Sequence, residues 1–189
     1  MSDTTPALEP YHYPKQYGAL LENTRAHEMQ ILHEDGVYRH LRFKAPDTMM
    51  WHFDLITWPG SLAIRGDIGS GFIFTRTVDM LRFFDQGQGP GWINASYWAE
   101  KLERGSRSAR EFSPSRFADW LRERDAGEAL EGAGEVENVN EAIEYLDRHQ
   151  IEWDFESPES WEDYEYHFLL ALHAILWGAK TYHAAKRGD

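Results

Sequence analysis

Apolar and polar positions alternate with period two in one stretch of this chain and return at helical spacing on both sides of it. Four short runs in that stretch have the alternation, or the aromatic and β-branched composition, of strands: residues 38–43, 51–58, 61–65 and 72–75. Turn sequences separate them, namely Ala45-Pro46-Asp47, Pro59-Gly60 and the Gly-rich segment 66–71. Because these connections are short, we predict an antiparallel meander.

Helices are predicted before and after the strands. A first helix should run from about residue 14 to 32 and end before Asp35-Gly36, since Gly36 can adopt the left-handed conformation of a helix C-terminus. Further helices are expected at residues 77–84, 94–102, 113–124 and 138–149, and a long last helix at 157–185. Residues that can cap a helix mark several starts: Asn94, Ser113 before Pro114, Asn138 or Asn140, and Ser157 before Pro158.

Together these elements predict the α+β class: a small antiparallel β-meander of about four strands packed against several helices, with a long C-terminal helix. A length of 189 residues fits a single domain. Within it we expect an irregular N-terminal arm at 1–13, a helix-plus-sheet part at 14–104 and an acidic helical part at 105–189.

Composition narrows the chemistry. The chain has no cysteine, so disulfides, thiolate metal sites and cysteine nucleophiles are excluded. Residues 1–14 lack the basic and apolar regions of a signal peptide, and the longest apolar stretch, 168–177, is far too short for a membrane span. We therefore expect a soluble protein of the cytoplasm.

The charge is concentrated in one segment. Residues 123–165 contain sixteen acidic and two basic side chains, whereas the other 146 residues contain sixteen acidic and seventeen basic ones. Acidic stretches are often only solvated surfaces that maintain solubility. This segment, however, also contains many large apolar residues, among them Leu146, Trp153 and Trp161, which a disordered acidic tail would lack. We therefore predict that its carboxylates are held in place on a folded scaffold.

Such a surface is suited to a basic partner, and large basic surfaces in cells commonly bind nucleic acid. Duplex DNA carries about one charge per 1.7 Å of axis. Acids at every third or fourth helical position lie about 5 Å apart, so two such rows would approximate a phosphate pattern. Rows of this kind are expected at 137, 141 and 144, and at 152, 156, 159 and 163 if that part is helical. The candidate protein-binding residues are Glu128, Glu131, Glu135, Glu137, Glu141, Glu144, Asp147, Glu152, Asp154 and Glu156.

No catalytic or metal-binding motif is evident. The nine histidines include no HExxH or similar spacing, and structural or surface roles are expected for them. The Gly-rich segment 66–71 joins two predicted strands and opens no helix, so it fits a hairpin loop better than a phosphate-binding loop. Neither a cofactor nor a metal is predicted. Several aromatic residues could stack on nucleotide bases, but most are expected in the core: Trp51, Trp58, Trp92, Tyr97 and Trp98.

One part of the sequence resembles a known group of proteins. Residues 38–43 (YRHLRF), 53–60 (FDLITWPG), 66–67 (GD) and 94–102 (NASYWAEKL) resemble a family of phage and prophage proteins, over residues 36–102. The whole chain is similar to type I-C anti-CRISPR proteins of mobile elements. That resemblance implies a non-enzymatic inhibitor whose acidic surface occupies the DNA-binding channel of the Cascade surveillance complex. It supplies no catalytic residue to carry over.

The sequence thus predicts an anti-CRISPR protein, an acidic DNA mimic that binds Cascade and blocks binding of target DNA in the bacterial host's cytoplasm. Its expected partners are Cascade subunits with a basic DNA-binding surface. Direct contact with nucleic acid or membrane is not expected, and the protein should be a monomer. Two alternatives remain open: an acidic inhibitor of another DNA-binding protein, or a phage accessory enzyme that uses carboxylates or histidines in a cleft.

Overall fold

The computed structural model of the protein describes residues 13–68 and 71–188, without the side chain of Glu128. The expected N-terminal arm therefore lies, except for Tyr13, outside the described residues. The chain divides into two compact units. We call residues 1–108 with 166–189 the sheet unit, and residues 109–165 the acidic unit. The C-terminal helix belongs to the sheet unit, so the boundaries differ from those of the acidic part expected at 105–189.

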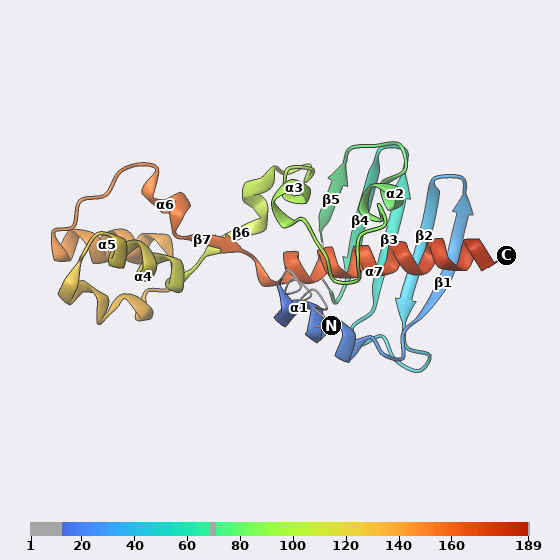
Figure 1. Ribbon diagram of the computed structural model, residues 1–189, viewed down its shortest axis with the longest axis horizontal. Coiled ribbons are helices and arrows are strands. Elements are labelled where there is room, and N and C mark those ends of the chain that lie inside the picture. Colours follow the sequence, from blue (N-terminus) through green and yellow to red (C-terminus); the bar gives the residue numbers. More distant parts are fainter. Residues whose placement is uncertain (1–12, 69–70, 189) are drawn as a thin grey trace, which may run out of the picture. The chain divides into compact units, whose positions relative to one another are not determined.

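The sheet unit contains an antiparallel meander, and the α+β class is confirmed (Figure 1). Its strands follow one another in chain order: β1 (Glu28–Asp35), β2 (Tyr38–Lys44), β3 (Phe53–Trp58), β4 (Ser61–Gly66) and β5 (Phe72–Thr75). The segment 66–71 connects two strands that pair antiparallel, as the hairpin prediction required.

Strand β1 adds a fifth strand to the predicted meander of about four. The first helix, α1 (Pro14–Asn23), ends well before residue 32, and Thr24 closes it by donating its backbone N–H to Leu20 O at 2.9 Å. Strand β1 then pairs with β2, for example Met29 with Phe43, across an irregularity between Ile31 and His33. It is an edge strand exposed along nearly all its length, so it has no period-two apolar pattern that would distinguish it from a helix.

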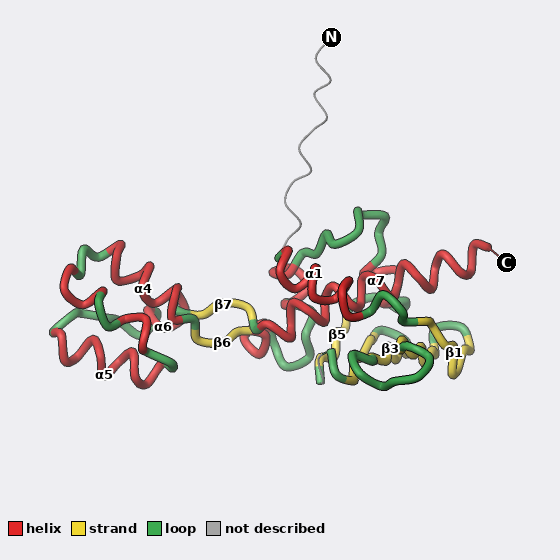
Figure 2. The backbone as a smooth tube through the Cα atoms, turned by 90° about the horizontal axis from the view of Figure 1, so that it is seen from below, coloured by secondary structure: helices red, strands yellow, loops and turns green. Residues whose placement is uncertain are grey.

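The core of the sheet unit lies between the sheet and the long helix α7 (Tyr166–Gly188), with α1 beside α7 (Figure 2). Two short helices complete the unit, α2 (Met80–Phe84) and α3 (Ala95–Ala99), followed by the turn η1 (Ser106–Ala109). Gly178 allows α7 to approach the sheet closely, because an added Cβ would lie 2.7 Å from a Leu55 methyl carbon and 3.1 Å from the Phe43 ring. None of the helices in the described part of the chain is long and apolar enough to cross a membrane.

The predicted last helix at 157–185 is wrong at its start. Residues 157–165 form instead a single helical turn, α6 (Ser157–Ser160), and strand β7 (Glu162–Tyr164). Strand β7 pairs with β6 (Arg110–Phe112), and Glu165 donates its backbone N–H to Ala109 O at 2.9 Å. Trp161 is fully buried in the acidic unit. Pairing with a distant strand and burial of this indole therefore override the local helical spacing.

The acidic unit has a hydrophobic core of its own. Its remaining elements are α4 (Pro114–Glu123), η2 (Gly127–Leu130), η3 (Ala133–Glu135) and α5 (Val139–His149). Ser113 and Asn138 cap α4 and α5 by accepting from the backbone N–H groups of Arg116 and Glu141. The buried side chains come from every part of the unit: Phe117, Ala118, Trp120, Leu121, Ala129, Ala133, Val136, Ala142, Tyr145, Leu146 and Trp161.

Candidate protein-binding surface

The net charge of the protein resides in the acidic unit. Residues 109–165 include eighteen acidic and five basic side chains, a net charge of −13, while the rest of the chain has fourteen of each. The compact unit at residues 109–165 therefore contains the whole of the acidic segment 123–165 and ends at the same residue. The predicted folded scaffold for the carboxylates is confirmed by the core beneath them.

All of the candidate acids whose side chains are described are exposed: Glu131, Glu135, Glu137, Glu141, Glu144, Asp147, Glu152, Asp154 and Glu156. None of these nine forms an ion pair with any residue that the structure describes. The ion pairs that the acidic unit does contain involve other acids, as in Arg116–Asp163 and Arg122–Asp119. The nine carboxylates therefore present their charge to solvent without an ion-paired base among the described residues.

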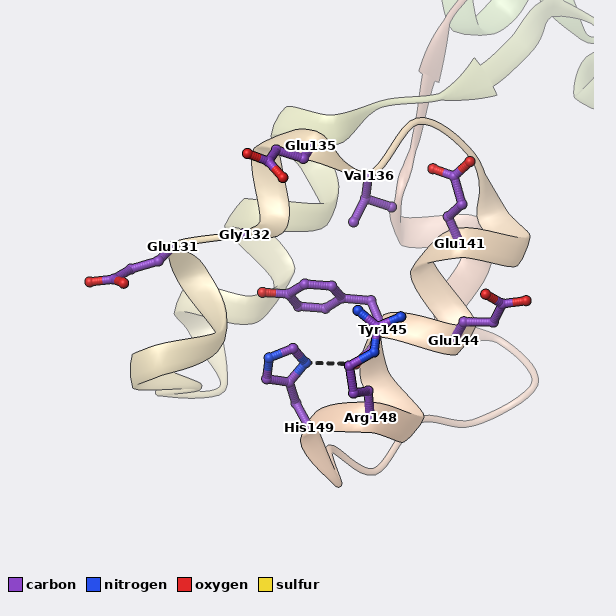
Figure 3. Close-up of a pocket in the computed structure, with 9 residues that line it drawn as sticks. All are labelled: Glu131, Gly132, Glu135, Val136, Glu141, Glu144, Tyr145, Arg148 and His149. Atoms are coloured by element: carbon purple, nitrogen blue, oxygen red, sulfur yellow. Dashed lines mark hydrogen bonds between the residues drawn. The ribbon is translucent and has the colours of Figure 1, made fainter.

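Four of these acids meet at one cavity of about 500 Å³, which we call the glutamate cavity (Figure 3). Its lining combines carboxylates with an aromatic ring, a guanidinium and an imidazole: Glu131, Gly132, Glu135, Val136, Glu141, Glu144, Tyr145, Arg148 and His149. Glu131 and Glu135 come from the segment around η3, while Glu141 and Glu144 come from α5 (Figure 3). The sequence named all four among the candidate acids but did not show that they line one cavity.

Tyr145 and His149 form the rigid part of the cavity. The Tyr145 hydroxyl donates to Ala129 O, and a Cβ at Gly132 would lie only 2.9 Å from that hydroxyl. The His149 ring stacks on Tyr145 with centroids 4.2 Å apart, and its Nδ1 lies 2.8 Å from the Tyr145 carbonyl oxygen. A carbonyl only accepts, so Nδ1 carries the proton and Nε2 remains available.

Glu141 has a structural role within the cavity. Its carboxylate accepts from the Glu137 backbone N–H at 2.8 Å and from the Asn138 side-chain amide at 2.7 Å, while the Asn138 oxygen accepts from the Glu141 N–H at 3.0 Å. This reciprocal pattern is a variant of the capping box. Glu137, however, precedes α5, so the expected row at 137, 141 and 144 contains only two helical acids, Glu141 and Glu144.

The second expected row does not exist as a helix. Gln150 ends α5 in a left-handed conformation (φ 57°), and residues 151–156 form a loop, which we call the acidic loop. The acids at 152 and 156 therefore lie in the acidic loop, the one at 159 in the short helix α6 and the one at 163 in β7, so they do not approximate a row of phosphates at helical spacing.

Asp147 and Asp154 hold the acidic loop in place. Asp154 Oδ1 accepts from the Ser157 hydroxyl at 2.7 Å and from the backbone N–H groups of Ser157 and Glu156 at 2.8 and 3.1 Å. These hydrogen bonds, those from Ser157 above all, lower the pKa of Asp154 because they stabilise the charged carboxylate. Asp147 accepts from the Trp153 indole N–H at 3.3 Å.

The acidic loop also exposes an aromatic residue that sequence reasoning did not select. Phe155 is 95% exposed, more than any other large apolar side chain described, and Trp153 is 37% exposed. Both alternate with the acids Glu152, Asp154 and Glu156. Aromatic residues are enriched in protein–protein interfaces, so Phe155 is a candidate contact residue. The alternation of aromatic and acidic residues at 152–156 was the signal that could have identified it.

Among the described residues, no group of three or more His, Asp or Glu side chains is arranged to hold a metal ion. Searches against protein-family models, curated proteins and solved structures found no match to this chain. Its function is therefore inferred from the residues of the acidic unit themselves.

Proposed function

We propose that the acidic unit is a protein-binding module that imitates the negative charge of nucleic acid and occupies the nucleic-acid-binding surface of a basic partner. One observation supports this above all: a compact unit with its own core carries a net charge of −13, while the rest of the chain is neutral. A chain that needed acid only for solubility would not have to confine it to one folded unit.

The Cascade surveillance complex is the first partner to test, because of the resemblance of this chain to type I-C anti-CRISPR proteins. In this proposal the acidic unit enters the DNA-binding channel of Cascade in the bacterial cytoplasm and prevents target DNA from binding. A basic subunit of another DNA-binding protein is the near alternative. Both fit the same surface, since a basic channel attracts carboxylates whatever its biological role.

The surface offers two kinds of contact. The unpaired carboxylates accelerate association with a basic channel, an effect that salt screens with a Debye length of about 8 Å at physiological ionic strength. Phe155 supplies an apolar contact, and full burial of a Phe side chain contributes about 1.5–3 kcal/mol. The carboxylates should therefore control mainly the association rate, and Phe155 mainly the dissociation rate.

The decisive experiment is competition for the partner. Purified Cascade is incubated with the protein and then titrated with fluorescent target duplex. The fraction of duplex that stays unbound is measured from its fluorescence. We expect the apparent affinity for duplex to fall as the protein concentration rises, and pre-bound duplex to prevent capture of the protein. Binding of the protein with unchanged duplex affinity would refute the mimicry. Failure to bind Cascade, together with displacement of DNA from another basic protein, would favour the near alternative.

An enzyme remains the second candidate function, because the glutamate cavity brings carboxylates, Arg148 and His149 together. The four glutamates are exposed, however, whereas catalytic carboxyls commonly owe their special reactivity to burial. The variant Glu144→Gln discriminates between the two functions. A catalytic role predicts loss of turnover with binding of a basic partner retained, and a docking role predicts only a small loss of affinity.

A further inference from the structure

Two cavities of the sheet unit meet at Gly87, in the loop that follows α2. One, the aromatic cavity, has a volume of about 450 Å³, and the other, the basic cavity, about 680 Å³. Both volumes are within the range of about 300–1,000 Å³ typical of small-molecule sites. Gly87 lines both of them and adopts a left-handed conformation (φ 89°). A side chain at this position would be strained, so glycine is favoured where the linings of the two cavities meet.

The aromatic cavity combines rings with side-chain amides: Phe83, Gln86, Gln88, Trp92, Asn94, Tyr97 and Trp98 line it together with Gly87. Trp92 and Tyr97 are 43% and 39% exposed, so these two rings are not core, contrary to the expectation for most such rings. Lys101 Nζ lies 4.1 Å from the centre of the Tyr97 ring. Exposed aromatic rings of this kind stack on planar ligands such as nucleobases.

The amides of this cavity leave one acceptor and one donor available. Gln86 donates from Nε2 to Phe83 O at 3.1 Å, and Asn94 Oδ1 accepts from the Tyr97 N–H at 3.2 Å. Gln86 Oε1 and Asn94 Nδ2 form no hydrogen bond with any residue in the described ranges. A neighbouring acceptor and donor are what the edge of a nucleobase requires, since every base presents both.

The basic cavity lies between the end of α2 and the end of α7. Its lining includes four basic residues, Arg82, Lys180, Lys186 and Arg187, together with His183 and a single acid, Asp85. Asp85 accepts from Lys180 at 3.1 Å and from His183 at 2.8 Å, and so fixes the two helices relative to each other. Burial alone would raise the pKa of Asp85, but these hydrogen bonds from His183 and Lys180 hold it below its usual value.

The basic cavity therefore carries an excess of positive charge. Arg82 is 82% exposed, with only a long 3.8 Å contact to Asp79, and Arg187 is also exposed. Guanidinium groups bind phosphate oxygens in pairs, and lysines add point charges. Lys180 is paired with Asp85 and Lys186 with Glu34 at 2.7 Å, so Arg82 and Arg187 are the side chains best placed to bind an added anionic group.

We propose that the two cavities form one binding site for a nucleoside phosphate, with the base between the rings of the aromatic cavity and the phosphate in the basic cavity. A neutral sugar would use the rings and amides but leave the basic cavity empty. An acidic peptide would use the basic residues but not the pair of amide groups. Only a planar hydrogen-bonding ring joined to a phosphate uses both. The site is confined to the sheet unit and does not depend on the function proposed for the acidic unit.

Calorimetric titration of the full-length protein with mononucleotides tests the site. The panel contains AMP, GMP, CMP and UMP, with adenosine and ribose 5-phosphate as the two halves of the ligand. We expect at least one mononucleotide to bind, with each half weaker by about tenfold or more. No binding of any nucleotide at millimolar concentration would overturn the proposal. Equal affinity for ribose 5-phosphate and the nucleotides would also overturn it, because the aromatic cavity would then contribute nothing.

Matched variants locate the binding. Trp92→Ala should weaken nucleotide binding by about tenfold or more. Its control is Trp153→Ala, which removes an indole of similar exposure from the acidic unit. Arg187→Ala should also weaken it, whereas Arg65→Ala, at an exposed position of β4, should not. Binding that is unchanged in both Trp92→Ala and Arg187→Ala would place the ligand elsewhere. Binding of single-stranded oligonucleotides with no affinity for mononucleotides would replace the proposal with a nucleic-acid surface.

Discussion

The two units use their carboxylates in opposite ways. In the sheet unit, three acids, Asp54, Asp79 and Asp85, are largely buried and paired with bases from other elements. Asp54 on β3 is 1% exposed and accepts from Arg42 at 2.8 Å and from His40 at 2.9 Å, both on β2. Asp79 accepts hydrogen bonds from both terminal nitrogens of Arg39, each at 3.0 Å. In the acidic unit, by contrast, the candidate acids are exposed and lack such partners within the described residues.

The difference separates structural acids from acids available for binding. A buried carboxylate must be paired, because desolvation of a lone charge costs several kcal/mol, and so it is committed to the fold. An exposed carboxylate costs the fold little and remains available to a partner. Glu141 and Asp154 are intermediate, since they are exposed but accept hydrogen bonds that hold α5 and the acidic loop. Tests of binding should therefore avoid these two positions.

The largest expected effect is on partner binding. Reversing Glu131 and Glu135 to Lys places like charges against a basic channel, which can cost several kcal/mol and should abolish binding to Cascade. The matched control reverses Glu22 and Glu28, exposed acids of the sheet unit, and should bind nearly normally. Surface plasmon resonance measures binding, and thermal melts verify that both variants fold. Equal losses in the two variants would show that only the overall charge matters.

The next effect concerns stability. Asp54→Asn leaves Arg42 and His40 without their carboxylate and should reduce the free energy of unfolding by about 3 kcal/mol. Asp47→Asn, at an exposed position, should change it by less than about 0.5 kcal/mol. Urea denaturation followed by circular dichroism provides the measurement. A small loss in Asp54→Asn would mean that the pair offsets its own desolvation and contributes little to the fold.

The pH dependence of stability follows from the same pair. Burial would raise the pKa of Asp54, but hydrogen bonds from Arg42 and His40 lower it below the ordinary value of 3.8. A lowered folded-state pKa means that the contribution is complete above the unfolded value and is lost as the pH falls through the folded value. The difference in stability between wild type and Asp54→Asn should therefore persist at neutral pH and shrink below about pH 4. A constant difference down to pH 2 would contradict this.

A smaller effect is expected at the exposed aromatic. Phe155→Ala should weaken partner binding by about 1.5–3 kcal/mol, chiefly through faster dissociation, and leave the melting temperature unchanged. Met50→Ala, which truncates a 70% exposed side chain in the sheet unit, is the control. Surface plasmon resonance separates the two rate constants. Slower association with an unchanged dissociation rate would show that Phe155 is not buried in the complex.

The smallest effect distinguishes two possible caps of α5. Asn138 accepts from the Glu141 N–H at 3.0 Å, so Asn138→Ala should lower the free energy of unfolding by about 1 kcal/mol. Asn140→Ala removes an exposed amide within the helix and should change it by only a few tenths of a kcal/mol. Chemical denaturation of the two variants gives the comparison, and equal effects would argue against the cap.

The sequence by itself determined what depends on near neighbours. Period-two alternation identified β2, because successive side chains of a strand point to opposite faces, and aromatic and β-branched runs between turn sequences identified β3 to β5. Ser113 marked the start of α4 because its side chain accepts from a backbone N–H three residues away. The concentration of acid at 123–165, with apolar residues among it, indicated a folded acidic scaffold without reference to any contact.

The tertiary structure decided what depends on residues far apart in the chain. Strand β1 exists because β2 offers it an edge, and its own exposed side chains gave no sign of this. The last helix begins at Tyr166 and not at Ser157, because β7 pairs with β6, as in Arg110 with Tyr164, and Trp161 completes a core formed with Phe117. The glutamate cavity and the exposed Phe155 arise in the same way. Local sequence patterns determine capping hydrogen bonds and the buried face of a helix or strand, because these involve residues close in the chain. Strand pairing and side-chain burial between segments about fifty residues apart form only when the whole chain packs.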